Sequence, residues 1–200
     1  DVVFGDWSSD VCSSDLVAFI TDIHGNLPAL EVFLDTISYH HVDILFIGGD
    51  VVGIGPFPSE CVGLIADFKE MPVKIVKGNH ELQILSSLSE QEKNPIPKSE
   101  AKHFEWVLKC LTPNQIEFIR GWPLNHCDQI GQESVLLIHY LLGQIYPFVS
   151  PLIDPEKLKC SLSEFHASTI FCGHDHKGFL WHGEGLILNP GSFGCQASSV

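Results

Sequence analysis

Carboxylate, imidazole and amide side chains recur where apolar runs end in this chain of 200 residues. Oxygen and nitrogen donors in that number suit two divalent ions better than one. No cysteine is among them, which points away from a structural zinc site and towards catalytic Mn, Fe or Zn. The candidate ligands are Asp22 and His24 after LVAFI, Asp50 after DILFIGG, Asn79 with His80 after VKIVKG, His139 in LLIHY, and His174 with His176 in GHDH.

Asp50 is the candidate bridge between the two ions. Ions about 3.5–4 Å apart can share a carboxylate and activate a bridging hydroxide, and Asp50 stands alone at the end of a central predicted strand. Taken singly, a histidine at a strand end is more often structural and an aspartate beside glycine is more often a turn former. Five strand ends with the same chemistry favour a shared site. The remaining histidines lack such support and are interpreted as surface or structural: His40, His41, His103, His126, His166 and His182.

A repeated strand–helix rhythm must position these side chains. Alternating elements of this kind imply parallel strands with right-handed crossovers, whose carboxyl ends lie along one edge. Since residues i and i+2 of an extended chain point the same way, we expect Asp22 and His24 to aim at one point, and His174 and His176 likewise. The predicted elements are strands 16–20, 43–50 and 73–80 and helices 27–40 and 58–71.

The second half of the chain predicts a helical insert followed by further strands. We expect one domain over 16–200, with an insert at about 82–122 that contains two short helices within 101–122. Strands are predicted at 134–140, 168–174, 178–182 and 185–192, the last two as an antiparallel hairpin. Residues 1–15 have no period and no signal-peptide design, and we expect a non-native leader derived from sequencing adapters.

Charge and cysteine usage narrow the class of protein. The net charge is −14, which argues against binding to duplex nucleic acid, but bound metal ions would still admit a phosphate substrate. No apolar run reaches the roughly 18 residues of a membrane span. The seven cysteines include no CxxC pair, which indicates a reducing, cytoplasmic setting rather than a disulfide framework.

The motifs DIHGN, GDVVGIGP, GNHE, LLIHY, GHDH and NPGS resemble the calcineurin-like metallophosphoesterase superfamily, most closely its small bacterial and archaeal phosphodiesterase branch. The resemblance implies an α/β fold, an α+β sandwich of two mixed sheets flanked by helices. It implies one metal ion on Asp22, His24, Asp50 and His176, and a second on Asp50, Asn79, His139 and His174. His80 would face the phosphate and the leaving group. Mn²⁺ is favoured for both ions, with Fe, Zn or Ni as alternatives.

Several positions depart from the pattern of that branch. Tyr140 stands where glycine is usual, Lys77 where arginine is frequent, and Glu81 where aspartate is common. No arginine follows Asp50 as it does in protein phosphatases, which makes a phosphoprotein substrate less favoured. Related chains continue beyond NPGS with another strand and helix, so we expect a truncated C-terminus.

The sequence therefore predicts a dinuclear metal-dependent phosphoesterase that hydrolyses a phosphodiester, a small phosphate ester or a nucleotide, by means of a metal-bridging hydroxide. Asp50 and His80 are its predicted catalytic residues. Two alternatives stay open on the same fold. One is a phosphomonoesterase or dinucleoside polyphosphate hydrolase, and the other is a catalytically silent scaffold that binds protein partners. The oligomeric state is left open.

Overall fold

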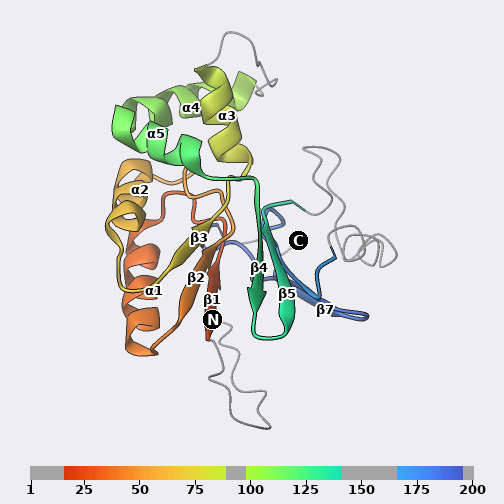
Figure 1. The fold of residues 1–200 in the computed structure, drawn as a ribbon. Coiled ribbons are helices and arrows are strands. Elements are labelled where there is room, and N and C mark those ends of the chain that lie inside the picture. Colours follow the sequence, from red (N-terminus) through yellow and green to blue (C-terminus); the bar gives the residue numbers. More distant parts are fainter. Residues whose placement is uncertain (1–15, 89–97, 141–165, 196–200) are drawn as a thin grey trace.

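Two β-sheets and five helices make up the part of the chain that this computed structural model describes, residues 16–88, 98–140 and 166–195 (Figure 1). The predicted leader, residues 1–15, lies outside these ranges. The elements in chain order are β1 (Val17–Ile20), α1 (Leu27–Tyr39), β2 (Ile44–Ile47), α2 (Pro58–Asp67), β3 (Val73–Ile75), α3 (Asn79–Ser87), α4 (Lys98–Cys110), α5 (Pro113–Gly121), β4 (Asn125–Ile130), β5 (Glu133–Ile138), β6 (Thr169–Phe171), β7 (Phe179–His182) and β8 (Leu186–Asn189).

The first sheet has the order β1-β2-β3, and its three strands are parallel, as the alternation of strands and helices predicts. β2 is the central strand and pairs Phe46 with Phe19 and with Lys74. It is buried on both sides, since Leu45 and Ile47 pack into one hydrophobic cluster and Phe46 into another. Burial on both faces explains why a parallel strand appears in the sequence as an uninterrupted apolar run.

Helices α1 and α2 lie along one face of this sheet (Figure 1). Leu30, Leu34 and Ile37 form the buried side of α1, in line with its helical spacing. The helix begins where the Asn26 side chain accepts a hydrogen bond from the Ala29 amide at 3.3 Å, and Pro28 occupies its first turn, where the missing N–H leaves no intrahelical bond unmade.

The second sheet has the order β4-β5-β6-β8-β7 and mixes parallel and antiparallel neighbours. The antiparallel hairpin predicted for the last two strands is confirmed, with Leu180 of β7 opposite Leu188 of β8. β4 was not predicted from the sequence. Its residues alternate between exposed and half-buried positions, and a strand at the sheet edge with so few apolar residues has no apolar run to mark it.

Aromatic side chains join the two sheets. The Phe171 ring of β6 lies 5.1 Å from Phe19 and 5.3 Å from Phe46, centroid to centroid, in edge-to-face contact with both. Val135 and Leu137 of β5 belong to the same buried cluster. The chain thus forms layers of helices, a parallel sheet and a mixed sheet, which confirms the expected α/β architecture of two sheets flanked by helices. Only the second sheet is mixed within the described residues, because helical crossovers connect all three strands of the first.

Helices α3, α4 and α5 gather beyond the end of the first sheet (Figure 1). α4 and α5 correspond to the two short helices predicted within 101–122, and the Thr112 hydroxyl caps α5 by accepting from the Gln115 amide at 3.3 Å. The prediction of a strand reaching to residue 80 was wrong: β3 ends at Ile75, and Asn79 and His80 lie in the first turn of α3. The reason is the next residue, because Glu81 reaches back to accept from the Gly78 amide at 2.8 Å and starts a helix there.

Within the described ranges, no helix combines the length and the apolar character that crossing a bilayer requires.

The packing of Phe171 predicts a measurable contribution to stability. Phe171→Ala should lower the free energy of unfolding by about 3–5 kcal/mol, because it removes the ring that contacts both sheets, and Phe171→Leu should lower it less. Chemical denaturation of the purified variants measures both. Leu180→Ala is the control, since that side chain is 58% exposed and its loss should change stability by no more than about 0.5 kcal/mol. Equal effects at positions 171 and 180 would contradict this account of the interface.

Candidate metal centre

All seven predicted metal ligands lie together at the carboxyl ends of strands from both sheets. They come from the segments after β1, β2, β5 and β6 and from the first turn of α3. Three groups of potential ligands arise among the described residues: His24 with His176 and Cys195, His24 with Asp50 and His80, and Asp50 with His139 and His174. The six histidines that lacked support in the sequence belong to none of these groups.

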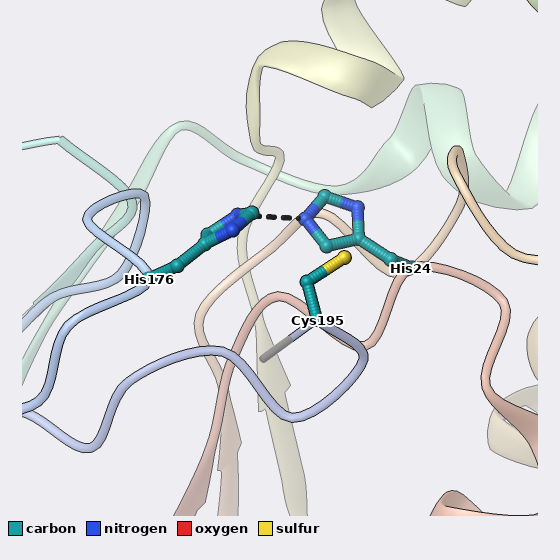
Figure 2. A group of neighbouring side chains, drawn as sticks. All are labelled: His24, His176 and Cys195. Carbon is teal, nitrogen blue, oxygen red and sulfur yellow. Dashed lines mark hydrogen bonds between the residues drawn. The ribbon is translucent and has the colours of Figure 1, made fainter. Parts of the chain in front are cut away.

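The first cluster contains Asp22, His24 and His176. The Nε2 atoms of the two histidines face each other at 3.1 Å, as Figure 2 shows. Asp22 Oδ1 lies 3.7 Å from Nε2 of His24 and 3.6 Å from Nε2 of His176. Donor atoms about 2.0–2.2 Å from one ion lie roughly 3.0–3.5 Å from each other, so these spacings suit a shared cation.

The second cluster contains Asn79, His139 and His174. The Asn79 amide oxygen lies 3.1 Å from Nε2 of His139 and 2.9 Å from Nδ1 of His174. The expectation that His174 and His176 aim at one point was wrong, because each faces a different cluster. His174 has a φ of 70°, so the chain is not extended there and the alternation of side chains does not apply.

Asp50 lies between the two clusters. Its Oδ2 atom is 3.4 Å from Nε2 of His139 and 4.0 Å from Nε2 of His24. Its Oδ1 atom accepts a hydrogen bond from the His80 amide at 2.9 Å, and the His80 ring lies close by, with Nε2 3.8 Å from Oδ2. One carboxylate therefore contacts groups of both clusters and holds the backbone of His80.

Backbone carbonyls orient two of the histidines. Nδ1 of His139 lies 2.6 Å from the Gly48 carbonyl, and Nδ1 of His24 lies 3.4 Å from the Val52 carbonyl. A carbonyl can only accept, so each Nδ1 carries a proton and donates it, which turns the Nε2 atom of each ring towards its cluster. Ligating histidines in proteins are commonly held in this way.

Left-handed backbone conformations occur at four of the seven residues. The φ angles are 53° at Asp22, 49° at His24, 51° at Asp50 and 70° at His174. Such angles are uncommon outside glycine and persist only where neighbouring contacts impose them. Here the loops after β1 and β2 are bonded together: the Asp22 amide donates to the Gly49 carbonyl at 3.0 Å and the His24 amide to the Asp50 carbonyl at 2.9 Å. Asp22 and His24 converge through these bonds, not through extended-chain alternation.

Glu81 holds the backbone around Asp50 and Gly78 in place, a role that the sequence did not predict. Its buried carboxylate accepts from the amides of Asp50 at 2.9 Å, Val52 at 3.1 Å and Gly78 at 2.8 Å. These three bonds fix the loop after β2 against the start of α3. The spacing of Gly78 and Glu81 at the start of a helix is the signal that could have revealed this role.

The NPGS motif, residues 189–192, is hydrogen-bonded to the loops that carry the first-cluster ligands. Nδ2 of Asn189 donates to the carbonyls of Gly173 at 3.0 Å and Asp175 at 2.9 Å, which holds the loop that carries His174 and His176. The Ser192 hydroxyl donates to the Asp22 carbonyl at 3.0 Å, and the Ser192 amide donates to the His176 carbonyl at 3.2 Å. The motif thus connects both loops of the first cluster.

The charges of the buried groups suit metal binding. Burial lowers the pKa of His24 to about 4, so this imidazole is neutral at physiological pH and can offer a lone pair. Burial by itself would raise the pKa of Asp50, but the facing His139 and His80 outweigh it and hold that pKa well below its usual range. Burial and the Asp50 charge raise the pKa of Glu81 to about 7. A neutral imidazole and an ionised carboxylate are the forms that bind cations.

The buried oxygens supply a further test of fit. Thr21 Oγ1 donates to Asp22 Oδ2 at 2.8 Å, and the His174 amide donates to the same oxygen at 2.9 Å. The other oxygen, Oδ1, is buried and has no hydrogen-bond partner among the described residues. A bound cation would satisfy this oxygen, which otherwise loses its hydration with no compensating bond. The residues present therefore fit a divalent metal.

Cys195, Tyr140 and Lys77 complete the surroundings. The sequence did not assign Cys195 to the site, yet its sulfur lies beside His24 and His176 (Figure 2). The centroid of the Tyr140 ring lies 4.7 Å from that of His139 and 4.8 Å from that of His174. This bulky neighbour does not keep His139 from the second cluster, since Nε2 of His139 still lies beside the Asn79 amide oxygen. Lys77 does not extend to the clusters, because its Nζ donates to the Arg120 carbonyl at 2.9 Å.

A family profile described as calcineurin-like phosphoesterase matches residues 16–178. An uncharacterised protein of Methanocaldococcus jannaschii is 30% identical over 177 residues, which make up 88% of this chain and 69% of that relative. A symmetrical bis(5'-nucleosyl)-tetraphosphatase of Wigglesworthia glossinidia brevipalpis is 30% identical over 148 residues, 72% of this chain, and the match spans about half of the relative, 51%.

The fold also matches solved structures. A hypothetical protein from Pyrococcus horikoshii OT3 superposes with a TM-score of 0.72 at 20% identity, and the match covers 89% of this chain and 77% of the other. At that identity the likeness concerns the arrangement of the two sheets and their helices.

The bonds of Glu81 predict a large effect on stability. Glu81→Ala leaves three buried backbone amides without an acceptor, and each such loss costs about 1–3 kcal/mol. The free energy of unfolding, measured in the presence of a chelator, should therefore fall by several kcal/mol. Glu81→Gln should have a smaller effect, because its amide oxygen can still accept from Asp50 and Gly78. The control is Glu31→Ala, an exposed position of α1. The interpretation fails if Glu81→Ala is as stable as this control.

Proposed function

The chain belongs to the calcineurin-like phosphoesterase family and is a hydrolase acting on phosphoric ester bonds, and from that premise we propose that it hydrolyses phosphodiesters with two divalent metal ions. The observation that carries this proposal is the position of Asp50, whose Oδ2 atom lies 4.0 Å from His24 of the first cluster and 3.4 Å from His139 of the second. A carboxylate in that position is suited to serve two ions at once.

Two sets of residues would hold the ions. Each set combines one histidine oriented by a backbone carbonyl with a second histidine and with oxygen donors. Mn²⁺ suits a site of imidazole, carboxylate and amide oxygen. The first set is Asp22, His24, Asp50 and His176, and the second is Asp50, Asn79, His139 and His174.

Bound divalent ions would neutralise phosphate charge and lower the pKa of coordinated water. The protein tunes the charge of this site through its choice of ligands. Asp22 and Asp50 supply the only carboxylates of the two sets, while Asn79 contributes a neutral oxygen. Two carboxylates leave a positive excess against two divalent ions, so the site would attract an anionic ester although the whole chain carries a net charge of −14.

His80 is positioned to assist departure of the leaving oxygen. Its side chain is 14% exposed, and its ring lies 4.7 Å from the His24 ring and 5.3 Å from the Phe104 ring, centroid to centroid. Gly53 makes room for this ring, since a side chain there would collide with Nδ1 of His80. A partly exposed imidazole held next to the metal ligands can give a proton to an alkoxide as the P–O bond breaks.

A dinucleoside polyphosphate is the second candidate substrate. The tetraphosphatase of Wigglesworthia glossinidia brevipalpis, which is 30% identical over 72% of this chain, favours it, since a phosphoanhydride cleaved between two nucleotides makes the same demands on charge neutralisation. We also infer a cytoplasmic setting, because every cysteine within the described residues is a free thiol.

A metal-reconstituted substrate panel tests the proposal. The chain is treated with a chelator, reloaded with Mn²⁺ and assayed on bis-p-nitrophenyl phosphate, p-nitrophenyl phosphate and diadenosine tetraphosphate. Phosphodiester hydrolysis predicts the highest kcat/KM on the first compound. A clear preference for diadenosine tetraphosphate would replace the phosphodiester proposal with the second candidate, and a preference for the monoester would refute both.

Replacing the shared carboxylate should affect both ions. Asp50→Asn removes the charge that both clusters would use, so the bound metal should fall from two ions per chain to fewer than one. Turnover should fall by more than the roughly 10–100-fold that loss of an outer-shell partner costs. Elemental analysis and steady-state kinetics measure the two quantities. Asp35→Asn, the same change at an exposed position of α1, should alter neither. Two retained ions and a near-normal rate in Asp50→Asn would refute the bridging role.

The role of His80 should depend on the leaving group. General acid assistance is typically worth about 10²–10⁴-fold, and an alkoxide needs that proton whereas a nitrophenolate does not. His80→Ala should therefore slow an alkyl or nucleotide diester much more than a nitrophenyl diester, with unchanged metal content. His182→Ala, an exposed histidine of β7, is the control. Equal losses on the two esters would remove His80 from the acid role, and loss of an ion would make it a ligand, as its place beside His24 and Asp50 also permits.

A further inference from the structure

Cys195 has the surroundings of a metal ligand. Its Sγ atom and one ring nitrogen each of His24 and His176 all lie within 4.8 Å of one another, and the three side chains converge from separate loops in Figure 2. Two other cysteines of the chain, Cys61 and Cys172, are buried apolar fillers by comparison, and neither belongs to a group of potential ligands among the described residues.

The backbone around Cys195 is attached to both loops of the first cluster. The Gly194 amide donates to the Asp22 carbonyl at 2.8 Å, and the Cys195 amide donates to the Ser192 hydroxyl at 2.8 Å. That hydroxyl donates in turn to the Asp22 carbonyl, while the Ser192 amide is bonded to His176. Gly194 allows this close approach, because a side chain there would collide with the Ile23 carbonyl. The position of the thiol is thus set by the segments that carry Asp22 and His176.

A second observation at the same place points to a cation. Asp22 Oδ1 is buried, lacks a hydrogen-bond partner among the described residues, and lies 3.7 Å from His24 Nε2 and 3.6 Å from His176 Nε2. The two imidazole nitrogens are themselves 3.1 Å apart. A carboxylate oxygen and two ring nitrogens in this arrangement already suit one ion, and the sulfur of Cys195 lies within 4.8 Å of one nitrogen of each ring.

We propose that Cys195 is a thiolate ligand of the ion held by Asp22, His24 and His176, so that the two ions of the centre differ in chemistry. This inference rests on the metal centre of the proposed function. On binding, the thiol would lose its proton to solvent as the sulfur–metal bond forms. Soft thiolate ligands select Zn²⁺ or Fe²⁺ over Mn²⁺. The ion on Asn79, His139 and His174 has no sulfur donor among the described residues and keeps the harder ligand set.

Cobalt spectroscopy separates this inference from the metal centre itself. The metal-free chain is titrated with Co²⁺, whose visible d–d bands report that the ion is bound and whose near-ultraviolet charge-transfer band reports a thiolate ligand. Wild type should show both. Cys195→Ser should lose the charge-transfer band and keep the d–d bands, and Cys127→Ser, the same change at an exposed cysteine of β4, should keep both.

The possible outcomes are distinct. Wild type with d–d bands alone, or a charge-transfer band that persists in Cys195→Ser, would overturn the thiolate ligand and leave the metal centre standing. Absence of all bands in wild type would overturn the metal centre and the inference with it. A second measurement avoids mutation: Zn²⁺ should block alkylation of Cys195 by iodoacetamide, detected by peptide mass spectrometry, while Cys127 in the same sample reacts unchanged. Unprotected Cys195 in a zinc-loaded chain would refute the proposal.

Discussion

The buried carboxylate of Glu81 connects the two loops on which the rest of the site depends. Its three hydrogen bonds, to the amides of Asp50, Val52 and Gly78, hold the left-handed turn at Asp50 and begin α3 at the same time. Gly78 lies so close to Asp50 that a side chain at position 78 would collide with the Asp50 carboxylate. A buried acceptor with three donors is a strong constraint, because each of the three amides would otherwise be left without a partner. Asp50, Asn79 and His80 owe their relative positions to it.

Charge compensation is the second constraint. Asp22, Asp50, His24 and His139 are almost completely buried, and unpaired charges in such surroundings are unfavourable. Burial alone would lower the pKa of His139, but the facing Asp50 carboxylate outweighs it and raises that pKa to about 9. In the absence of a metal ion, a proton on His139 therefore balances the charge of Asp50. Divalent ions would supply the missing positive charge without protons and would free the imidazole lone pairs. The strained backbone at Asp22, His24, Asp50 and His174 is consistent with a preformed site, in which strain is offset by the bonds of the surrounding loops.

The two clusters are chemically unequal. The second is lined by the amide of Asn79 and by the ring of Tyr140, which packs against both of its histidines. The first has the thiol of Cys195 at its side. With the proposed ligand roles, one ion would sit among harder donors and the other would have a sulfur donor. Such asymmetry would let one ion be exchanged without the other, and it places Tyr140 and Cys195 beside different ions of one site.

The sequence by itself determined the parallel orientation of β1, β2 and β3, the antiparallel pair β7 and β8, and which polar residues gather at the strand ends, because apolar runs and the residues that end them are local properties. It also led to the family. Only the tertiary structure decided which of those residues belong to the first cluster and which to the second. His174 and His176 separate because the backbone at His174 is left-handed, and Asn79 with His80 belongs to a helix because Glu81 caps it. Cys195 reaches the first cluster through bonds from Ser192 and Gly194 to Asp22, which join residues far apart in the chain. No local pattern encodes contacts of that kind, since they exist only once both sheets have packed together.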